Sequence, residues 1–231
     1  MKSVLIIGAS GRTGVQLIQQ LTQRNFSKAS IFAFCRDLTK IDKHTLALCD
    51  GVYQGDAMVK DDLEKAINDS KAEVVVMSIG NGDNVGKTDI RTASAKALVA
   101  VLSKPKYQQV KVCVISSNGA GGSRIRVGYG IGRIIEFHLR HILTDHTGQE
   151  NAFRVASFKD RVMIVRPTAL VDNQKEAGHY VIKIFGDLEK PPSIQTDRAV
   201  LAEWISKHIC EEESMVTFGC TPSNVTCIAS N

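Results

Sequence analysis

Short apolar runs alternate with amphipathic stretches along most of the 231 residues. The runs with the length and composition of buried strands cover residues 4–7, 29–35, 51–55, 73–79, 110–115 and 161–166. Between them, apolar residues recur at helical spacing, as in Ile90, Ala93, Ala97, Leu98 and Val101. Strands that alternate with helices predict a parallel sheet covered on both faces, which is the doubly wound α/β class.

The chain shows no internal repeat and no low-complexity linker, and its length suits one α/β domain over residues 1–231. We expect residues 167–231 to contribute a small lobe on the substrate side. In that part the pattern predicts a strand, a helix and a strand at 180–185, 196–208 and 215–218.

Residues 131–156 read as one long helical stretch with an interruption near Gly148. Its expected core side consists of Ile134, Ile135, Leu139, Ile142 and Leu143.

A glycine-rich turn, GASGRTG, follows the first apolar run and opens an amphipathic helix. Its glycines permit a sharp turn, close approach of a phosphate and close packing of the helix on the strand. The helix N-terminus offers free N–H groups and the positive end of its dipole to an anion. An ordinary glycine-rich loop is the alternative, but the flanking strand and helix favour a dinucleotide pyrophosphate site. The candidate residues are Gly8, Ser10, Gly11, Arg12, Thr13 and Gly14.

The end of the second predicted strand bears on which dinucleotide binds. In doubly wound folds an acidic residue there binds the ribose 2′-hydroxyl of NAD, whereas an arginine accommodates the 2′-phosphate of NADP. Arg36 follows the strand directly, and Lys40 lies four residues further on. These two cations favour NADP(H) as the cofactor. The alternative is that Asp37 binds the ribose hydroxyl while Arg36 faces solvent.

Two further loops follow predicted strands, at the edge of the sheet where open α/β folds bind ligands. The central run EVVVMSI leads into Ser78, Ile79 and Gly80, and we expect this loop to lie beside the cofactor. The next strand ends at Ser116 and Ser117. A serine pair before a glycine-rich turn is also ordinary loop chemistry.

The GxxGxxG spacing of the first turn resembles that of atypical short-chain dehydrogenase/reductases, especially NmrA-like proteins and biliverdin-IXβ or flavin reductases. Arg166 and Pro167 begin a segment that is similar to the RPxxL segment of the same family. The resemblance implies a Rossmann fold that binds NAD(P). It also implies that the backbone from Pro167 to Ala169, including Thr168, borders the nicotinamide and that Asp56, next to Ala57, lies near the adenine. For Asp56 a plain helix cap is the alternative, and both roles can hold together.

The same resemblance suggests catalytic residues. Short-chain reductases place a serine that hydrogen-bonds a substrate carbonyl. By resemblance Ser117 takes that role, Ser116 is the second candidate for it, and Ser116 is also expected to contact the cofactor. Tyr129 follows about a dozen residues later, as the family's active tyrosine does. The family has a lysine four residues after that tyrosine, whereas this chain has Arg133, which is not an equivalent residue. Many NmrA-like and flavin-reductase relatives lack the tyrosine-lysine pair, and the lysine that relatives often carry within residues 145–151 is also missing here.

Other residue types change this picture little. The six cysteines form no CxxC pair, and His138 and His141 have no carboxylate or cysteine at matching offsets, so we expect no metal. The net charge of +5 comes from scattered basic residues without aromatic interleaving, which argues against nucleic acid as a partner. The local cluster of Arg124, Arg126 and Arg133 reads as a solvated surface.

The first apolar run stops at Gly8 without a cleavage-like site, and no segment has the length of a membrane span. We therefore expect a cytoplasmic protein without a membrane partner, either a monomer or a weak homodimer. The leading hypothesis is an NADPH-dependent reductase that passes hydride to a small electron-poor acceptor such as a flavin, a biliverdin-like tetrapyrrole or a quinone. The alternative is an NADP-binding redox sensor or scaffold without catalysis.

Overall fold

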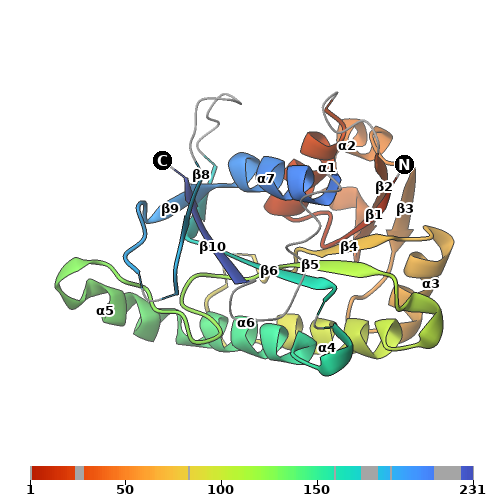
Figure 1. Ribbon diagram of the computed structural model, residues 1–231. Coiled ribbons are helices and arrows are strands. Elements are labelled where there is room, and N and C mark those ends of the chain that lie inside the picture. The colour runs from red at the N-terminus through yellow and green to blue at the C-terminus, as the bar shows by residue number, and fades with distance from the viewer. Residues whose placement is uncertain are drawn as a thin grey trace.

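The computed structural model describes residues 2–23, 29–82, 84–158, 160–172, 182–187, 189–210 and 225–230. In these residues, eight strands form one sheet in the order β3-β2-β1-β4-β5-β6-β10-β8, and helices cover both of its faces (Figure 1). The strands of this sheet are β1 (Lys2–Ile7), β2 (Ala29–Cys35), β3 (Gly51–Gln54), β4 (Val74–Met77), β5 (Lys111–Ile115), β6 (Val162–Pro167), β8 (Ile182–Phe185) and β10 (Val225–Ser230). The strands β7 (Ala169–Val171) and β9 (Gln195–Asp197) form a separate two-stranded pair.

Seven neighbouring strands of the large sheet, β3 to β10 in the sheet order, run parallel, and β8 pairs with β10 in the antiparallel sense. The chain order reverses between β1 and β4, so a ligand site is expected at the carboxyl ends of these two strands. This arrangement confirms the doubly wound Rossmann fold that the alternating pattern predicts.

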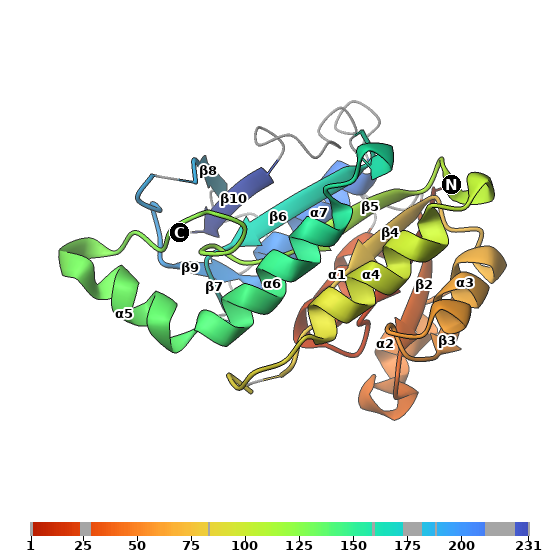
Figure 2. The same ribbon diagram turned by 90° about the horizontal axis from the view of Figure 1, so that it is seen from below.

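Two helical layers enclose the sheet. One layer contains α1 (Arg12–Leu21) and α7 (Arg198–Cys210), which pack against each other. The other contains α3 (Lys60–Asp69), α4 (Ile90–Leu102) and α6 (Arg140–Phe153), which lie side by side in Figure 2. The short α2 (Lys43–Ala47) and the outlying α5 (Ile131–His138) complete the α-helices of the described residues.

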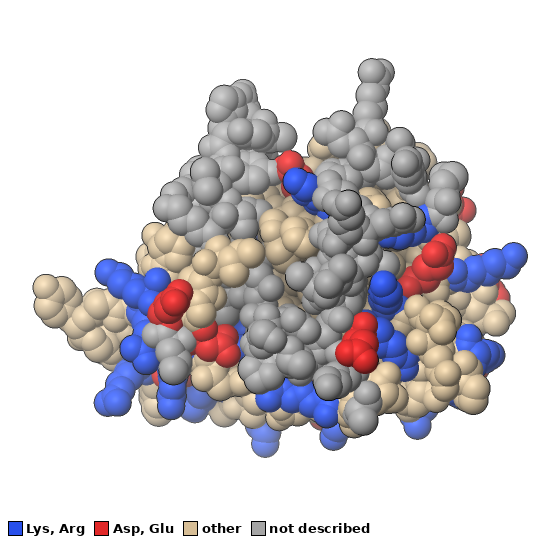
Figure 3. Space-filling view, viewed as in Figure 1, with Lys and Arg blue, Asp and Glu red and all other residues tan. Residues whose placement is uncertain are grey.

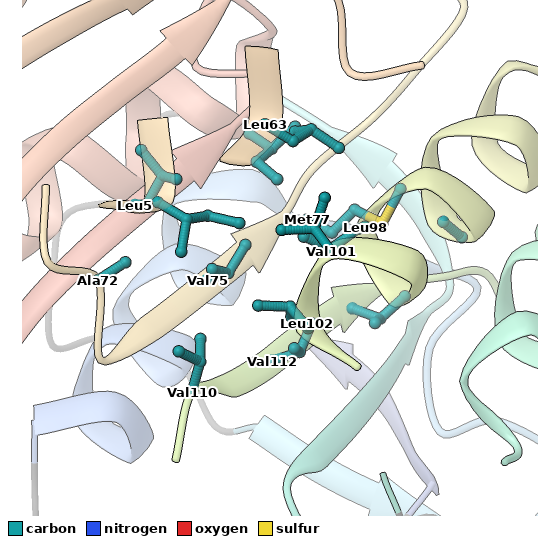
Figure 4. Close-up of a cluster of buried hydrophobic side chains, with 14 of the residues drawn as sticks. Leu5, Leu63, Ala72, Val75, Met77, Leu98, Val101, Leu102, Val110 and Val112 are labelled. Atoms are coloured by element: carbon teal, nitrogen blue, oxygen red, sulfur yellow. The ribbon is translucent and has the colours of Figure 1, made fainter. Parts of the chain in front are cut away.

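The core explains why apolar and polar residues do not alternate along the central strands. All four residues of β4 are buried, because helices cover both of its faces. Figure 4 shows the core on the α3 and α4 side, where strand residues meet helix residues: Leu5, Val75, Met77 and Val112 lie against Leu63, Leu98, Val101 and Leu102. Both layers fix the strand ends that carry the loops described below.

The helical stretch after β5 differs from its prediction. It breaks at Leu139 and not near Gly148, so that α5 and α6 are separate helices. Gly148 lies inside α6, where a Cβ would be 2.2 Å from Oγ1 of Thr92, so a glycine lets α6 approach α4 closely. Ile134 was expected in the core, but it is 70% exposed because α5 projects away from the sheet.

The last part of the chain is predicted less completely. A helix at 196–208 is confirmed as α7, and β8 covers most of the strand expected at 180–185. The strand expected at 215–218 lies outside the described residues, whereas β10 was not predicted.

Candidate functional site: a cleft at the carboxyl ends of the strands

A cleft of about 650 Å³ opens at the carboxyl ends of the parallel strands, where the strand order reverses. Loops after β1 to β6 line it, together with residues of α4, α6 and the start of α7. Residues from distant parts of the sequence therefore meet in one place, as expected for a ligand at a switch point. The predicted site residues that line the cleft are Gly8, Ser10, Gly11, Arg12, Thr13, Arg36, Lys40, Asp56, Ala57, Ser78, Ile79, Gly80, Ser116, Ser117, Pro167 and Thr168.

The glycine-rich turn forms a cradle that side chains would fill. Gly8 has a φ of +86°, and a Cβ on it would lie only 2.3 Å from the backbone oxygen of Ser78. Gly14 does not line the cleft, but its Cβ would lie 2.4 Å from the backbone oxygen of Gly8, so it sets how closely α1 packs on β1. Gly11 caps α1 without a side-chain hydrogen bond, which leaves the first amides of the helix for a ligand. This geometry fits the diphosphate of a dinucleotide.

The loop after β2 presents two exposed cations to the cleft, Arg36 and Lys40. Asp37 also lines the cleft, but its carboxylate accepts hydrogen bonds from the backbone N–H of Thr39 at 3.0 Å and from the Thr39 hydroxyl at 2.6 Å. These two bonds lower the pKa of Asp37 and commit one of its oxygens to capping the short 3-10 helix Leu38–Lys40. Within the loop after β2, the two cations are thus the side chains best placed to meet a phosphate.

Asp56 lies at the end of β3 and lines the cleft. Its Oδ1 accepts a hydrogen bond from the backbone N–H of Met58 at 2.9 Å, which stabilises the turn before α3. The N-cap of α3 is Val59, so Asp56 does not cap the helix itself. The plain helix-cap alternative for Asp56 is therefore wrong.

Ser116 is held by a buried ionic network behind the cleft. Its Oγ donates to Oε1 of Glu150 at 2.6 Å, and Glu150 accepts two hydrogen bonds from Arg166, from Nε at 2.8 Å and from Nη2 at 2.6 Å. Arg166 also contacts Asp187 at 2.8 Å. Burial alone would lower the pKa of Arg166, but its bonds to Glu150 and Asp187 outweigh burial and raise it. The network fixes the ends of β5 and β6 relative to α6.

Ser117 is the more available of the two serines. It is half-buried, and its hydroxyl has a long contact of 3.2 Å to the backbone oxygen of Asn118. The adjacent loop is tied to β6, because the Asn118 N–H donates to the oxygen of Pro167 at 2.9 Å. Thr168 is fixed by a 2.8 Å bond between its hydroxyl and that of Thr196.

The face of α6 that lines the cleft carries Ile142 and His146, four residues apart. This spacing equals that of the tyrosine-lysine pair of short-chain reductases, but neither residue type is present at these positions. His146 is buried, and its Nδ1 lies 3.2 Å from Oε1 of Gln149. Burial, with the nearby positive charge of Arg91, lowers its pKa to about 3, so the imidazole is neutral at physiological pH.

Tyr129, predicted as a catalytic residue, does not line the cleft. It lies on the exposed 3-10 turn Gly128–Gly130, and its side chain is entirely exposed. Arg133, four residues later, is exposed as well. The structure brings Ser117 to the cleft and leaves Tyr129 outside it.

Sequence reasoning missed a polar group on α4. Arg91 and Ser94 line the cleft, and Asp145 of α6 contacts Nη1 of Arg91 at 3.3 Å. Asp145 also accepts a bond from the backbone N–H of Thr92 at 2.9 Å, so α6 caps α4. Nε of Arg91 and Oγ of Ser94 are buried without a hydrogen-bond partner in the described part of the chain. No local signal marks these contacts, because they join residues more than fifty positions apart.

Arg198 was also missed. It lines the cleft at the start of α7, and its Nη1 lies 2.8 Å from Oδ2 of Asp172. The same carboxylate oxygen contacts Nη1 of Arg12 at 3.3 Å. Asp172 therefore joins the glycine-rich turn to α7.

Among the described residues, no helix is long and apolar enough to cross a membrane.

Comparison with known proteins places this cleft in context. Residues 8–212 match the model of the NAD(P)H-binding family. The structure is similar to a short-chain dehydrogenase/reductase from Veillonella parvula DSM 2008 in complex with NADP, with a TM-score of 0.76 and 19% identity over 99% of this chain and 94% of that one. It is also similar to ChuY, an anaerobillin reductase from Escherichia coli O157:H7, with a TM-score of 0.69 and 13% identity over 98% of this chain and 96% of that one.

A curated relative matches in sequence over part of its length. Sterol-4-alpha-carboxylate 3-dehydrogenase ERG26 from Saccharomyces cerevisiae is 39% identical over 122 residues, which are 50% of this chain and 34% of the relative. The chain thus spans about a third of that enzyme. The family match extends from the first glycine of the cradle to α7, and the chain therefore belongs to the NAD(P)H-binding family.

Proposed function

We propose that this chain is an NADPH-dependent oxidoreductase that passes hydride to a small electron-poor acceptor, of the flavin, biliverdin-like or quinone type. The observation that carries the proposal is one cleft that joins a phosphate cradle, two exposed cations and a serine hydroxyl, but whose described lining contains no tyrosine. Such a site positions a cofactor well, yet offers no phenol to protonate a substrate. It suits acceptors whose reduction needs little acid catalysis.

The preference for NADPH rests on the loop after β2. Arg36 and Lys40 are exposed at the cleft, whereas an oxygen of Asp37 is already bonded twice to Thr39. A ribose 2′-phosphate would meet two positive charges here, and a ribose hydroxyl would have to share the carboxylate with Thr39. Calorimetric titration of both reduced cofactors tests this preference. Tighter binding of NADH than of NADPH would contradict it.

In the proposed mechanism, the residues of this chain bind and orient the cofactor and the acceptor. The amides at the start of α1 would hold the diphosphate, and the backbone from Pro167 to Ala169 would border the nicotinamide. When bound, the reduced cofactor would supply the hydride. The Ser117 hydroxyl donates a hydrogen bond to the acceptor, and the proton comes from solvent through the open side of the cleft.

Replacing Ser117 with alanine tests that role. We expect turnover to fall by about tenfold to a hundredfold, because one hydrogen bond to the acceptor is lost, while NADPH affinity stays nearly unchanged. Steady-state kinetics and a binding titration measure the two effects separately. Wild-type turnover in Ser117→Ala would refute the assignment, and Thr22→Ala, whose hydroxyl lies outside the cleft, serves as the control.

A redox sensor or scaffold is the second candidate, and the pair Ile142 and His146 at the cleft favours it because neither side chain supplies an acid at neutral pH. NADPH oxidation against FMN, riboflavin, biliverdin and quinones separates the two functions. Saturable turnover with one acceptor supports the reductase. Tight NADPH binding without turnover on any of these acceptors supports the sensor, as does a partner that is captured only with NADPH present.

A further inference from the structure

A projecting segment of the chain lies outside the cleft and has no part in the function proposed above. This segment, here called the α5 arm, covers residues 124–140, from the last part of the loop after β5 through α5 to the first residue of α6. Figures 1 and 2 both show α5 extending from one end of the molecule beyond the sheet and the other helices. The arm therefore presents much of its surface to solvent.

The α5 arm exposes a row of large apolar side chains. Ile131, Ile134 and Phe137 are 48%, 70% and 70% exposed, and their spacing of three residues puts them on one face of α5. Tyr129 precedes this face and is fully exposed. An apolar strip on a short projecting helix is not part of a core, and exposed apolar patches are typical of interaction surfaces.

The backbone of the α5 arm adds to this picture. Tyr129 has a φ of +58°, a left-handed conformation that costs a bulky residue free energy. The next residue, Gly130, has a φ of +78°, so two consecutive residues take left-handed conformations where α5 begins, and only one of them is a glycine. The chain therefore holds a fully exposed aromatic side chain in a strained conformation directly before α5.

Positive charges flank the apolar strip. Arg126, Arg133 and Arg140 are exposed, and the guanidinium of Arg140 lies 4.6 Å from the ring centre of Phe137. The arm contains one acidic residue, Glu136, and that carboxylate pairs with Arg124 at 3.2 Å and accepts the Ile125 N–H at 2.8 Å. In Figure 3 this end of the molecule is an uncharged projection with Lys and Arg side chains next to it.

We propose that the α5 arm docks this protein on the surface of a membrane that contains anionic lipids. Its apolar side chains would enter the boundary between headgroups and acyl chains, while the arginines contact lipid phosphates. The charge pattern selects this occupant. A second copy of the arm would bring the same arginines together, and a nucleic acid would leave Ile131 and Ile134 without apolar contact.

Docking of this kind is compatible with the lack of a spanning helix in the described residues. It does depart from the sequence-based expectation of no membrane partner, because that expectation considered only the length of apolar runs. A short amphipathic helix binds the interface reversibly and leaves the body of the protein in water.

Vesicle flotation with the full chain tests the proposal. We expect binding to vesicles of phosphatidylcholine with phosphatidylserine, weaker binding at high salt, and little binding to phosphatidylcholine alone. The double variant Ile134→Ser/Phe137→Ser should reduce partitioning by about tenfold or more, because it removes apolar area that would enter the membrane. Ile194→Ser, at an exposed isoleucine outside the arm, is the matched control.

NADPH binding is measured on every variant to confirm that each one folds. Failure of the wild-type chain to bind the mixed vesicles overturns the proposal, as does equal binding by the double variant. A dimer or a complex with single-stranded DNA that the double variant abolishes, without vesicle binding, assigns the arm to that partner and also overturns it. None of these outcomes depends on reductase activity.

Discussion

Glu150 carries its charge with none of its side chain exposed, and the reason lies in its neighbours. It accepts two hydrogen bonds from the equally buried Arg166 and one from Ser116, so the cost of removing both charges from water is offset by close contacts. The sequence predicted Arg166 as part of a strand end and Ser116 as a loop residue. It could not pair them with Glu150, because their contacts depend on how α6 lies on the sheet.

Replacing Glu150 with glutamine should show the value of this pair. We expect the free energy of unfolding to fall by about 3–5 kcal/mol, because Arg166 would remain buried with only the partly exposed Asp187 as its counter-charge. Urea unfolding measures the loss. Glu203→Gln on α7, at an acid that is not fully buried, should change stability little, and an equal loss in both variants would contradict the assignment.

His146 predicts a pH dependence. Its pKa of about 3 in the folded protein lies below the ordinary value of 6.5, so between these values the unfolded chain binds more protons than the folded one. Stability must then fall as the pH drops below about 6.5, by about 2 kcal/mol between pH 7 and pH 5. We expect this slope to be smaller in His146→Gln when urea unfolding is measured at both pH values. An unchanged slope would show that His146 is not the group responsible.

At the scale of the elements, periodicity predicted the strands well and the helix after β5 poorly. Strands β1, β2, β4, β5 and β6 are largely buried apolar runs, and such runs are visible without knowledge of their neighbours. The edge strand β3 is half exposed. The apolar face of α5 is equally visible, but periodicity does not tell whether another element covers that face. The predicted helix break near Gly148 is wrong for a related reason. A glycine can either break a helix or let two helices approach closely, and the sequence alone does not distinguish these roles.

The contact of α1 with β1 depends on Gly14. In Gly14→Ala, a Cβ would lie 2.4 Å from the oxygen of Gly8, so the helix must move away from the strand and from the diphosphate. We expect NADPH affinity to fall by about tenfold or more and stability to fall by about 1–3 kcal/mol. Calorimetry and urea unfolding measure the two effects.

Gly128→Ala is the control for this substitution, because its Cβ would meet open space and the residue lies outside the cleft. If Gly14→Ala bound NADPH as tightly as this control does, close packing of α1 would not be a requirement of the site.

For the molecule as a whole, the sequence predicted the fold class and most of the cleft. The reason is that parallel strands bring all their carboxyl ends to one edge, so each predicted strand end becomes a predicted site residue. The prediction of Tyr129 as a site residue did not rest on a strand end. It rested on the sequence separation between Ser117 and Tyr129, and the intervening chain leads into the projecting α5 arm and not back to the cleft. The polar group around Arg91 also escaped, since it is built by contact between two helices.

The strand β10 closes the sheet between β6 and β8. Cys227→Pro should lower the free energy of unfolding by about 3 kcal/mol or more, because an internal strand loses an N–H donor and gains a rigid ring. Cys227→Ala keeps the N–H and should be far less harmful. Thermal unfolding compares the two, and similar losses would mean that the side chain and not the pairing matters.

That position in the sheet sets an order of events during synthesis. Residues 225–230 leave the ribosome after every other described strand, yet they separate β6 from β8. Until they emerge, the nascent chain holds the complete glycine cradle and the cofactor-facing ends of β1 to β6 beside an open edge of β6. A nascent chain could therefore acquire its nucleotide before its sheet is finished, and during that interval the unpaired edge of β6 is open to pairing with other chains.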